Sequence, residues 1–481
     1  MIGATREALL LVGACALLQA CGSHAPGDPS AGEPFGGEGP TGAVQRDVLF
    51  VTMDTTRPDL FGIHGHDAGA TPSVDALAAR GALFERHYST SPMTGPSHAS
   101  MFTGLLPSEH GLLKNGRVLP DDAVTVAEVL GDAGYATAAV VGSRVLEQHF
   151  GVAQGFDVYE DRIEGGEGRR ANSAERPASE VVDLALEVIA SRNPDAPLFL
   201  WVHVFDPHRP FDAAWEYDPE QVARFLPRVE PTELFAPERL AVDWAMYEAE
   251  IAATDAELGR LFAGWDARGG ERADAVVVTA DHGEGMGEHD YLKHMLYLYE
   301  EQIRVPFVVR AEGLVPAGVR HARATSMLDV ATTLTQLAGV DGSAFEGHDL
   351  TALVEDDDAP RSRVIAERPP LGAHERSLPD LAAALEAHPD RGRTRGDLFA
   401  FVADDDGGWS KFLWSGEVQP ELYDLVTDPA ELDNLVDERS DRTAALARHA
   451  REWREGLGPT PEAELLTDED TLEMLEQLGY R

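Results

Sequence analysis

Three long, mainly apolar runs constrain the fold of this chain more than any other feature. They cover residues 48–53, 198–205 and 275–280, and a shorter run has the same character at 138–141. Strands that are apolar at consecutive positions are typical of parallel sheets covered by helices on both faces. Helical patterns lie between the runs, at 72–78 and 124–130, and after the last one, at 329–338. The sequence therefore predicts an α/β fold with a mostly parallel central sheet flanked by helices.

Residues of metal-binding type follow the ends of these runs. Asp54 follows the first run, His208 lies between two prolines after the second, and Asp281 and His282 follow the third. Ligand sites in open α/β sheets lie just beyond the carboxyl ends of the strands. Each residue alone has an ordinary explanation, such as capping the next helix, and we interpret His203 within the second run as a core histidine. Together they predict a metal site with mixed oxygen and nitrogen ligands.

A loop at residues 91–104 places hydroxyls and an imidazole close together. Thr94 and His98 flank Pro96, and the residues that follow are able to start a helix. A hydroxyl at a helix N-terminus, near unpaired backbone N–H groups, is well placed to meet an anion. The alternative is an ordinary turn before a core helix. Beside a metal, the hydroxyl of Thr94 would have a lowered pKa and would act as a nucleophile.

Later segments read less clearly. We expect residues 212–242 to be irregular and to cover the site, and residues 351–396 to form a mobile loop or insertion. Pro306 suggests that its strand is an edge strand or contains a bulge. Short antiparallel strands are expected at 399–402 and 411–414. These patterns predict a smaller α+β subdomain over residues 346–481, after a catalytic domain at 47–345.

The charge balance excludes some classes of partner. Lys and Arg total 39 and Asp and Glu total 84, so the formal net charge is −45. Such a surface repels nucleic acid and anionic lipid. A free anionic substrate would be repelled too, unless a metal or local Arg and His reverse the sign inside the pocket. We therefore expect no nucleic-acid partner, and the composition leaves the oligomeric state open.

The N-terminus reads as an export signal. Residues 1–20 contain a short apolar run and end in Leu18-Gln19-Ala20, before Cys21, which resembles a bacterial lipobox. Cys21 would then be lipidated, and residues 21–46, rich in Gly, Pro and Ala, would form a disordered tether. This predicts a location in the bacterial cell envelope, with membrane contact only through the lipid. A plain secretion signal is the alternative.

Several motifs in order resemble the sulfatase family of the alkaline phosphatase superfamily. The resemblance runs from about Asp47 to Leu435 and implies an alkaline-phosphatase-like fold. Its motifs are Asp54-Thr55-Thr56-Arg57-Pro58-Asp59, the stretch Thr94–Gly104, Asp206-Pro207-His208-Arg209-Pro210-Phe211, Asp281-His282-Gly283-Glu284, Leu298–Pro306 and Glu421-Leu422-Tyr423-Asp424-Leu425.

The departures from that family concern the nucleophile and its neighbours. Sulfatases carry a Cys or Ser that is oxidised to formylglycine, supported by an Arg, whereas this chain has Thr94 and His98. Thr cannot form that aldehyde, so we expect no formylglycine. His282 replaces the usual Asn, and Lys293 and His294 compete for the position of the catalytic Lys. The branches of the superfamily that use Thr mostly act on phosphoryl groups.

The resemblance implies a metal-dependent hydrolase of sulfate, phosphate or phosphonate esters, with phosphoryl chemistry favoured. Thr94 would be the nucleophile and, with the other ligands, would hold Zn²⁺ or Mn²⁺ in preference to Ca²⁺ or Mg²⁺. His208 and His294 would bind the anion, protonate the leaving group or hold a second metal. The substrate is an anionic ester, and its contacts are expected to come from Asn115, His98 and Lys293; the alternative for Asn115 is a role in forming a turn. Headgroup transfer, as in phosphoethanolamine transferases, and an inactive anion-binding lipoprotein are the alternatives.

Overall fold

The computed structural model describes residues 44–477 with gaps. The gaps are 68, 164–174, 212–218, 230–231, 233, 270–271, 355–363, 374, 388–395, 406–407 and 417. The predicted signal peptide, Cys21 and nearly all of the predicted tether therefore lie outside the described residues. In the described part of the chain, no helix combines the length and the apolar character needed to cross a membrane.

One large mixed sheet forms the centre of the molecule, and its parallel strands confirm the predicted fold class. Eight strands lie side by side, and only β9 runs antiparallel to its neighbours. In spatial order they are β10 (Val319–Ser326), β2 (Ala82–Tyr88), β9 (Arg304–Arg310), β6 (Asp274–Ala280), β1 (Asp47–Met53), β5 (Leu198–Val204), β3 (Ala136–Val141) and β4 (Val158–Glu160).

Strand β9 lies inside the sheet, so the expectation of an edge strand at Pro306 was wrong. It lies between β2 and β6. Pro306 falls where the pairing of β9 with β2 shifts register, between the pairs Phe84–Phe307 and His87–Val305. Proline has no N–H to give to a ladder, and an irregularity removes the need for that bond. The alternative expectation, a bulge, describes this position.

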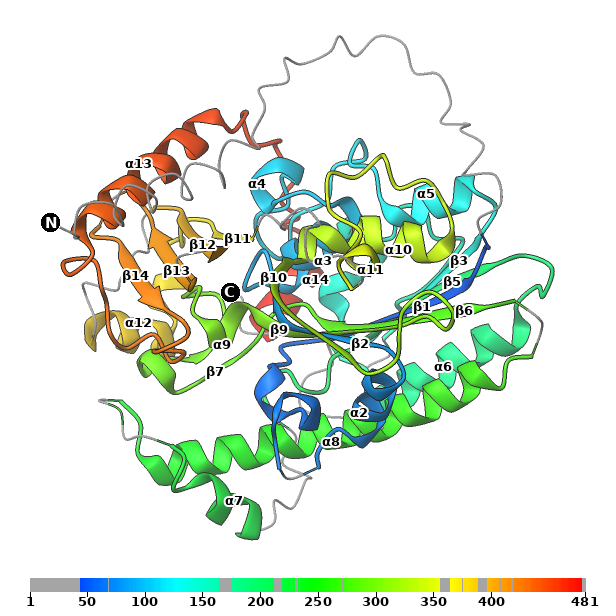
Figure 1. Ribbon diagram of the computed structural model, residues 1–481, viewed down its shortest axis with the longest axis horizontal. Helices are drawn as coiled ribbons and strands as arrows, with labels where there is room; N and C mark the ends of the chain where they lie inside the picture. Colours follow the sequence, from blue (N-terminus) through cyan, green and yellow to red (C-terminus); the bar gives the residue numbers. More distant parts are fainter. Residues whose placement is uncertain are drawn as a thin grey trace, which may run out of the picture.

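Helices cover both faces of the central sheet (Figure 1). Because β1, β5 and β6 are buried on both sides, each face has its own apolar core. One face packs against α2 (Pro72–Ala79), α6 (Ala178–Ser191) and the long helix α8 (Pro237–Asp266). The other packs against α3 (Thr94–Thr103), α5 (Val126–Asp132), α10 (Val330–Ala338) and α11 (Leu350–Leu353).

Two segments expected to be irregular contain regular elements. The segment 212–242 holds helix α7 (Pro219–Phe225) and the start of α8, and the segment 351–396 holds β11 (Ile365–Arg368) and α12 (Pro379–Ala387). Their signals are weak because prolines at 219, 227, 231 and 237 interrupt the first segment and because the second is poor in apolar residues. Their order comes from packing: Phe225 of α7 lies in a small core with α8, and Ala366 of β11 is buried in the C-terminal core.

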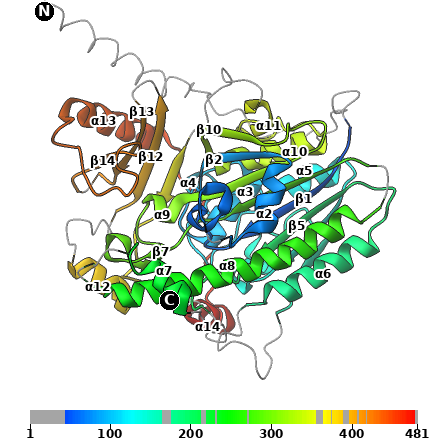
Figure 2. The same cartoon turned by 60° about the horizontal axis from the view of Figure 1, so that its bottom comes forward.

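The C-terminal region forms a second, antiparallel sheet beside the first (Figure 2). Both expected strands are present as β12 (Leu398–Asp405) and β13 (Gly408–Trp414), between β11 and β14 (Glu421–Asp424). Helix α13 (Ser440–Gly456) packs on one face of this sheet. Helix α14 (Glu469–Gln477) returns to the main core, where Met474 and Leu475 are buried. The division after residue 345 stays a prediction.

Candidate active site

The register of three neighbouring parallel strands brings the predicted metal ligands together. In β1, Met53 pairs with Val204 of β5 on one side and with Ala280 of β6 on the other. The next residues of β1 and β6 are Asp54 and Asp281, so both carboxylates leave the sheet at the same level. One ligand atom each from Asp54, Asp281 and His282 lies within 4.8 Å of the other two, and all three residues are buried.

Hydrogen bonds fix which atoms of Asp281 and His282 face that point. Oδ1 of Asp281 accepts bonds from the backbone N–H groups of Thr55 (3.0 Å) and His282 (2.8 Å). Its other oxygen, Oδ2, has no hydrogen-bond partner among the described residues. Nδ1 of His282 donates to the carbonyl of Gly283 at 2.9 Å, so Nε2 of the neutral ring carries the lone pair.

Asp54 completes a donor set that fits a divalent cation. Its Oδ1 has no hydrogen-bond partner in the described structure, and burial together with the charge of Asp281 raises its pKa well above the usual range. Within the described residues, no Lys or Arg forms an ion pair with Asp54 or Asp281; their ion-pair partners are histidines. Buried carboxylates without a cation are costly. Two oxygens and an imidazole nitrogen aimed at one point suit Zn²⁺ or Mn²⁺.

Thr94 lies beside this triad, at the first position of helix α3. Its Oγ1 is 3.5 Å from Nε2 of His282, and its side chain hydrogen-bonds Asp54. The next N–H of the helix, on Gly95, donates to Oδ1 of Asn115 at 2.8 Å. Nδ2 of Asn115 is buried and has no hydrogen-bond partner within the described part of the chain. Asn115 therefore has a buried amide donor and is bonded to Gly95, the residue that follows the candidate nucleophile.

His98, expected as a substrate contact, forms hydrogen bonds within the protein. Its Nδ1 donates to the carbonyl of Thr94 at 2.8 Å, and its Nε2 lies 3.1 Å from Oγ1 of Thr52. Trp201 donates to the same hydroxyl at 3.0 Å, so the proton of Thr52 is directed at His98. Both ring nitrogens are therefore used within the protein. His98 fixes the first turn of α3 behind Thr94, which sequence position alone did not show, and its role as a substrate contact stays a prediction.

Two further predicted histidines close the other side of the site. The ring centroid of His294 lies 4.5 Å from the ring centroid of His282 and 5.1 Å from that of His208. Burial lowers the pKa of both, to about 3 for His208 and well below the usual range for His294. Lys293, the competing residue, is only partly buried, at the end of the short strand β8 (Leu292–Lys293). Position therefore favours His294 over Lys293 at the centre of the site.

Sequence reasoning missed two residues that shape this site. Glu284 is fully buried, and its Oε1 lies 3.5 Å from Nδ1 of His294. Tyr247 lies among the apolar core positions of α8, yet its hydroxyl donates to the carbonyl of Thr55 (2.6 Å) and accepts from the N–H of Arg57 (2.9 Å). These bonds hold Thr55 at φ 48°, a conformation costly for a β-branched residue. A tyrosine among core positions was the available signal, because its buried hydroxyl needs a partner.

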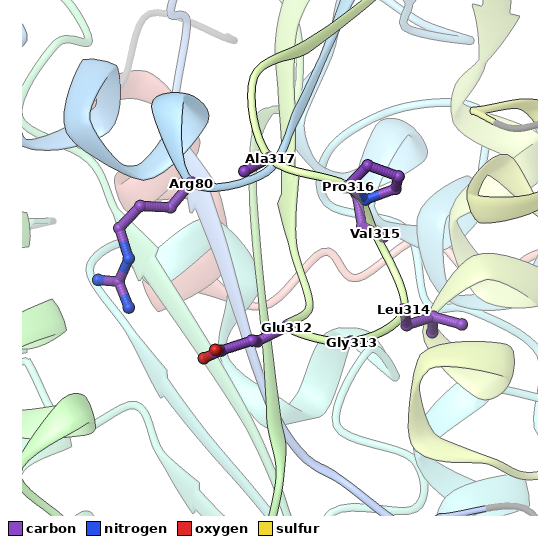
Figure 3. A pocket seen from close by; sticks show the side chains of 7 residues that line it. All are labelled: Arg80, Glu312, Gly313, Leu314, Val315, Pro316 and Ala317. Atoms are coloured by element: carbon purple, nitrogen blue, oxygen red, sulfur yellow. The ribbon is translucent and has the colours of Figure 1, made fainter.

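A surface hollow of about 470 Å³ lies elsewhere (Figure 3). It is lined by Arg80 and by the turn at 312–317, which follows β9. The last residue of β9, Arg310, pairs with Val276 near the start of β6. The hollow is therefore at the opposite edge of the sheet from Asp54 and Asp281 and has no part in their chemistry.

Comparison with known proteins identifies the family. The sulfatase family model matches residues 46–340. The chain belongs to the sulfatase family. An ulvan-active sulfatase of Formosa agariphila is 27% identical over 391 residues, covering 74% of this chain and 75% of that protein. Membership places this protein among the ester hydrolases of the alkaline phosphatase superfamily, which confirms the resemblance that the motifs indicated.

Solved structures match the fold across nearly the whole chain. A protein solved in complex with its substrate, D-glucosamine-2-N,6-O-disulfate, matches with a TM-score of 0.66 at 18% identity. The match covers 87% of this chain and 100% of that protein's chain. Phosphonate monoester hydrolase of Agrobacterium radiobacter has a TM-score of 0.65 at 22% identity, covering 85% of this chain and 95% of its own. One fold thus serves both sulfate and phosphonate esters.

Proposed function

We propose that this protein is a metal-dependent hydrolase that uses Thr94 as its nucleophile and prefers phosphate or phosphonate esters to sulfate esters. The observation that carries the proposal is the position of Thr94, whose side chain bonds Asp54 and lies 3.5 Å from His282. Asp54, Asp281 and His282, together with Thr94, would hold the ion. When bound, a divalent ion lowers the pKa of the hydroxyl and offsets negative charge on the substrate.

The identity of the nucleophile favours phosphoryl chemistry. A formylglycine hydrate releases sulfate by collapsing to the aldehyde, so water never has to attack sulfur. A sulfate ester of Thr94 has no such route. A phosphate ester of Thr94 can instead be displaced in line by water, with return of the hydroxyl to the protein. The fold does not decide between the two anions, so the argument depends on this side chain.

The residues around Thr94 supply the remaining roles. Asn115 is bonded to Gly95, the residue after the nucleophile, and has a buried amide donor. Such a donor suits an oxygen that becomes more negative in the transition state. His208 and His294 each carry at least one ring N–H and lie together on the far side of His282. They are placed to donate to the anion or to the leaving oxygen. His98 holds the backbone of Thr94, because its Nδ1 donates to the Thr94 carbonyl.

A comparison of esters with the same aryl leaving group tests the proposal. The purified protein is assayed with Mn²⁺ or Zn²⁺ on equal concentrations of an aryl phosphodiester, an aryl phosphonate monoester and an aryl sulfate. We expect higher kcat/KM for the phosphorus esters. A clear preference for the sulfate would show that the leaving anion is misassigned, and anion binding without turnover would favour a binding protein.

We also propose that the protein is a lipoprotein of the bacterial cell envelope. The support is the sequence Leu18-Gln19-Ala20 before Cys21, followed by a stretch poor in large apolar residues. Cys21→Ala should move the protein from the membrane fraction to the soluble fraction, as read by immunoblotting after fractionation. Unchanged membrane retention would rule out the lipid anchor.

A further inference from the structure

A buried histidine lies directly behind the ligand Asp54 and is not among the metal-binding residues. His203 is on β5, where it pairs with Thr52 of β1, two residues before Asp54. It is fully buried. Its Nε2 is 3.3 Å from Oδ2 of Asp54, whereas Oδ1 is the oxygen without a hydrogen-bond partner in the described structure.

The other ring nitrogen determines where the proton of His203 lies. The backbone N–H of Gly142 donates to Nδ1 at 3.4 Å. A nitrogen that accepts a hydrogen bond carries no proton, so the proton of the neutral ring is on Nε2. A doubly protonated ring is excluded by the same contact, because it would oppose two N–H groups. His203 therefore donates to Asp54 in one direction only.

We propose that His203 is a positioning residue that orients Asp54 for metal binding. By occupying Oδ2, it turns Oδ1 toward Oδ2 of Asp281 and Nε2 of His282. Asp281 is oriented by two backbone N–H groups, which only a substitution to proline would remove. Asp54 is held by two side chains, Thr94 of the donor set and, from outside that set, His203. Such supporting hydrogen bonds typically contribute about 10–100-fold to metal affinity. The inference rests on the proposed metal site.

Two substitutions separate the bond to Asp54 from the bond to Gly142. In His203→Gln, the amide nitrogen reaches the position of Nε2 and can still donate to Asp54. In His203→Asn, the amide oxygen lies near the position of Nδ1 and can still accept from Gly142, but the shorter side chain does not reach Asp54. The two variants are similar in polarity, and each keeps one of the two bonds.

The affinity for Mn²⁺ is measured by calorimetry on full-length protein treated with a chelator. We expect His203→Asn to weaken binding by about 10–100-fold and His203→Gln by less than about threefold. Equal affinity of His203→Asn and the wild type, or equal weakening in both variants, would overturn the role of His203. A wild type that binds no Mn²⁺ would instead overturn the metal site itself, and this inference with it.

A spectroscopic measurement keeps the inference testable if His203→Asn does not fold. In metal-free wild-type protein labelled with ¹⁵N-histidine, the signals of His203 are identified by their loss in His203→Gln. We expect a neutral ring with its proton on Nε2. A proton on Nδ1 would contradict the hydrogen-bond direction and overturn the proposal.

Discussion

Two groups of buried charged side chains in the described part of this molecule differ in the source of their positive charge. The metal-ligand triad of Asp54, Asp281 and His282 leaves ligand atoms without a hydrogen-bond partner among the described residues. The lysine cluster, at the contact between the two sheets, has Nζ of Lys411 at 2.8 Å from Glu300 and 3.1 Å from Glu431. Burial alone would lower the pKa of Lys411, but these two carboxylates raise it.

Buried carboxylates join parts of the fold at the lysine cluster, whereas at the triad they are the proposed metal ligands. In the lysine cluster the cation is part of the chain, and Lys411 of β13 is tied to helix α9 (Glu300–Ile303) and to Leu298. The cluster therefore joins the C-terminal sheet to the segment that follows the site. In the triad the chain provides only the acceptors. We infer that a cation from solution, rather than a side chain, balances the charge of the triad.

The largest effect is expected from Thr94→Ala, which keeps the buried charges of the triad and removes only the hydroxyl. Loss of covalent catalysis should lower kcat by several powers of ten, each tenfold step being about 1.36 kcal/mol of barrier. Thr94→Ser keeps a hydroxyl and should retain much of the activity. Both are measured with the preferred aryl ester and with Mn²⁺. Full activity of Thr94→Ala would show that Thr94 is not the nucleophile.

Lys411→Met should destabilise the protein whether or not metal is present. Removing one partner of a buried charge cluster leaves Glu300 and Glu431 without their cation, which costs about 3–5 kcal/mol of unfolding free energy. Urea unfolding with and without Mn²⁺ measures it. Arg260→Met is the matched control, because Arg260 forms an exposed ion pair with Asp183 and its loss should change little. If Lys411→Met were as stable as Arg260→Met, the charge of Lys411 would not be needed to balance the buried carboxylates of the lysine cluster.

Asp54→Asn should affect stability differently from Lys411→Met, because its effect should depend on the metal. It removes an unbalanced buried charge, so the metal-free variant should be as stable as the wild type or more stable. Mn²⁺ at about 100 times its Kd should stabilise the wild type by about 2.7 kcal/mol and the variant hardly at all. Thermal unfolding midpoints with and without Mn²⁺ provide the comparison. Equal stabilisation of the variant would mean that the ion binds elsewhere.

The smallest effect concerns another buried carboxylate, Glu367 of β11, which accepts hydrogen bonds from Oγ (2.7 Å) and N (3.0 Å) of Ser108. Burial raises its pKa from 4.5 to about 7 although these bonds lower it. The folded state thus holds the proton more tightly, so stability is lost as pH rises between these values. At pH 8, Glu367→Gln should be more stable relative to the wild type by about 2–3 kcal/mol than at pH 4.5.

Unfolding midpoints of this pair across pH 4.5–8 test the assignment. Gln can accept from the N–H of Ser108 and donate to its hydroxyl, so the contact is kept while the charge is removed. A difference between the two proteins that does not change with pH would show that Glu367 ionises as readily in the folded state as in the unfolded chain.

The sequence by itself determined the central sheet and the residues at its carboxyl edge. Runs such as 48–53 and 275–280 are apolar on both faces, and covalent order alone places Asp54 and Asp281 at their ends. The same logic brought Thr94 to a helix N-terminus. Weakly apolar segments such as β11 were missed, because their order comes from contacts with distant strands rather than from local pattern.

The tertiary structure decided the direction of each side chain in the site. The bond from Thr55 to Asp281 spans 226 positions of the chain, and the bond from Tyr247 to Thr55 spans 192. Local sequence does not encode such pairings, because they form only when strands and helices far apart in the chain pack together. For the same reason the sequence did not show the hydrogen-bond partners of His98 and His203. Their partners, Thr52, Trp201 and Gly142, come from other strands or lie at their ends.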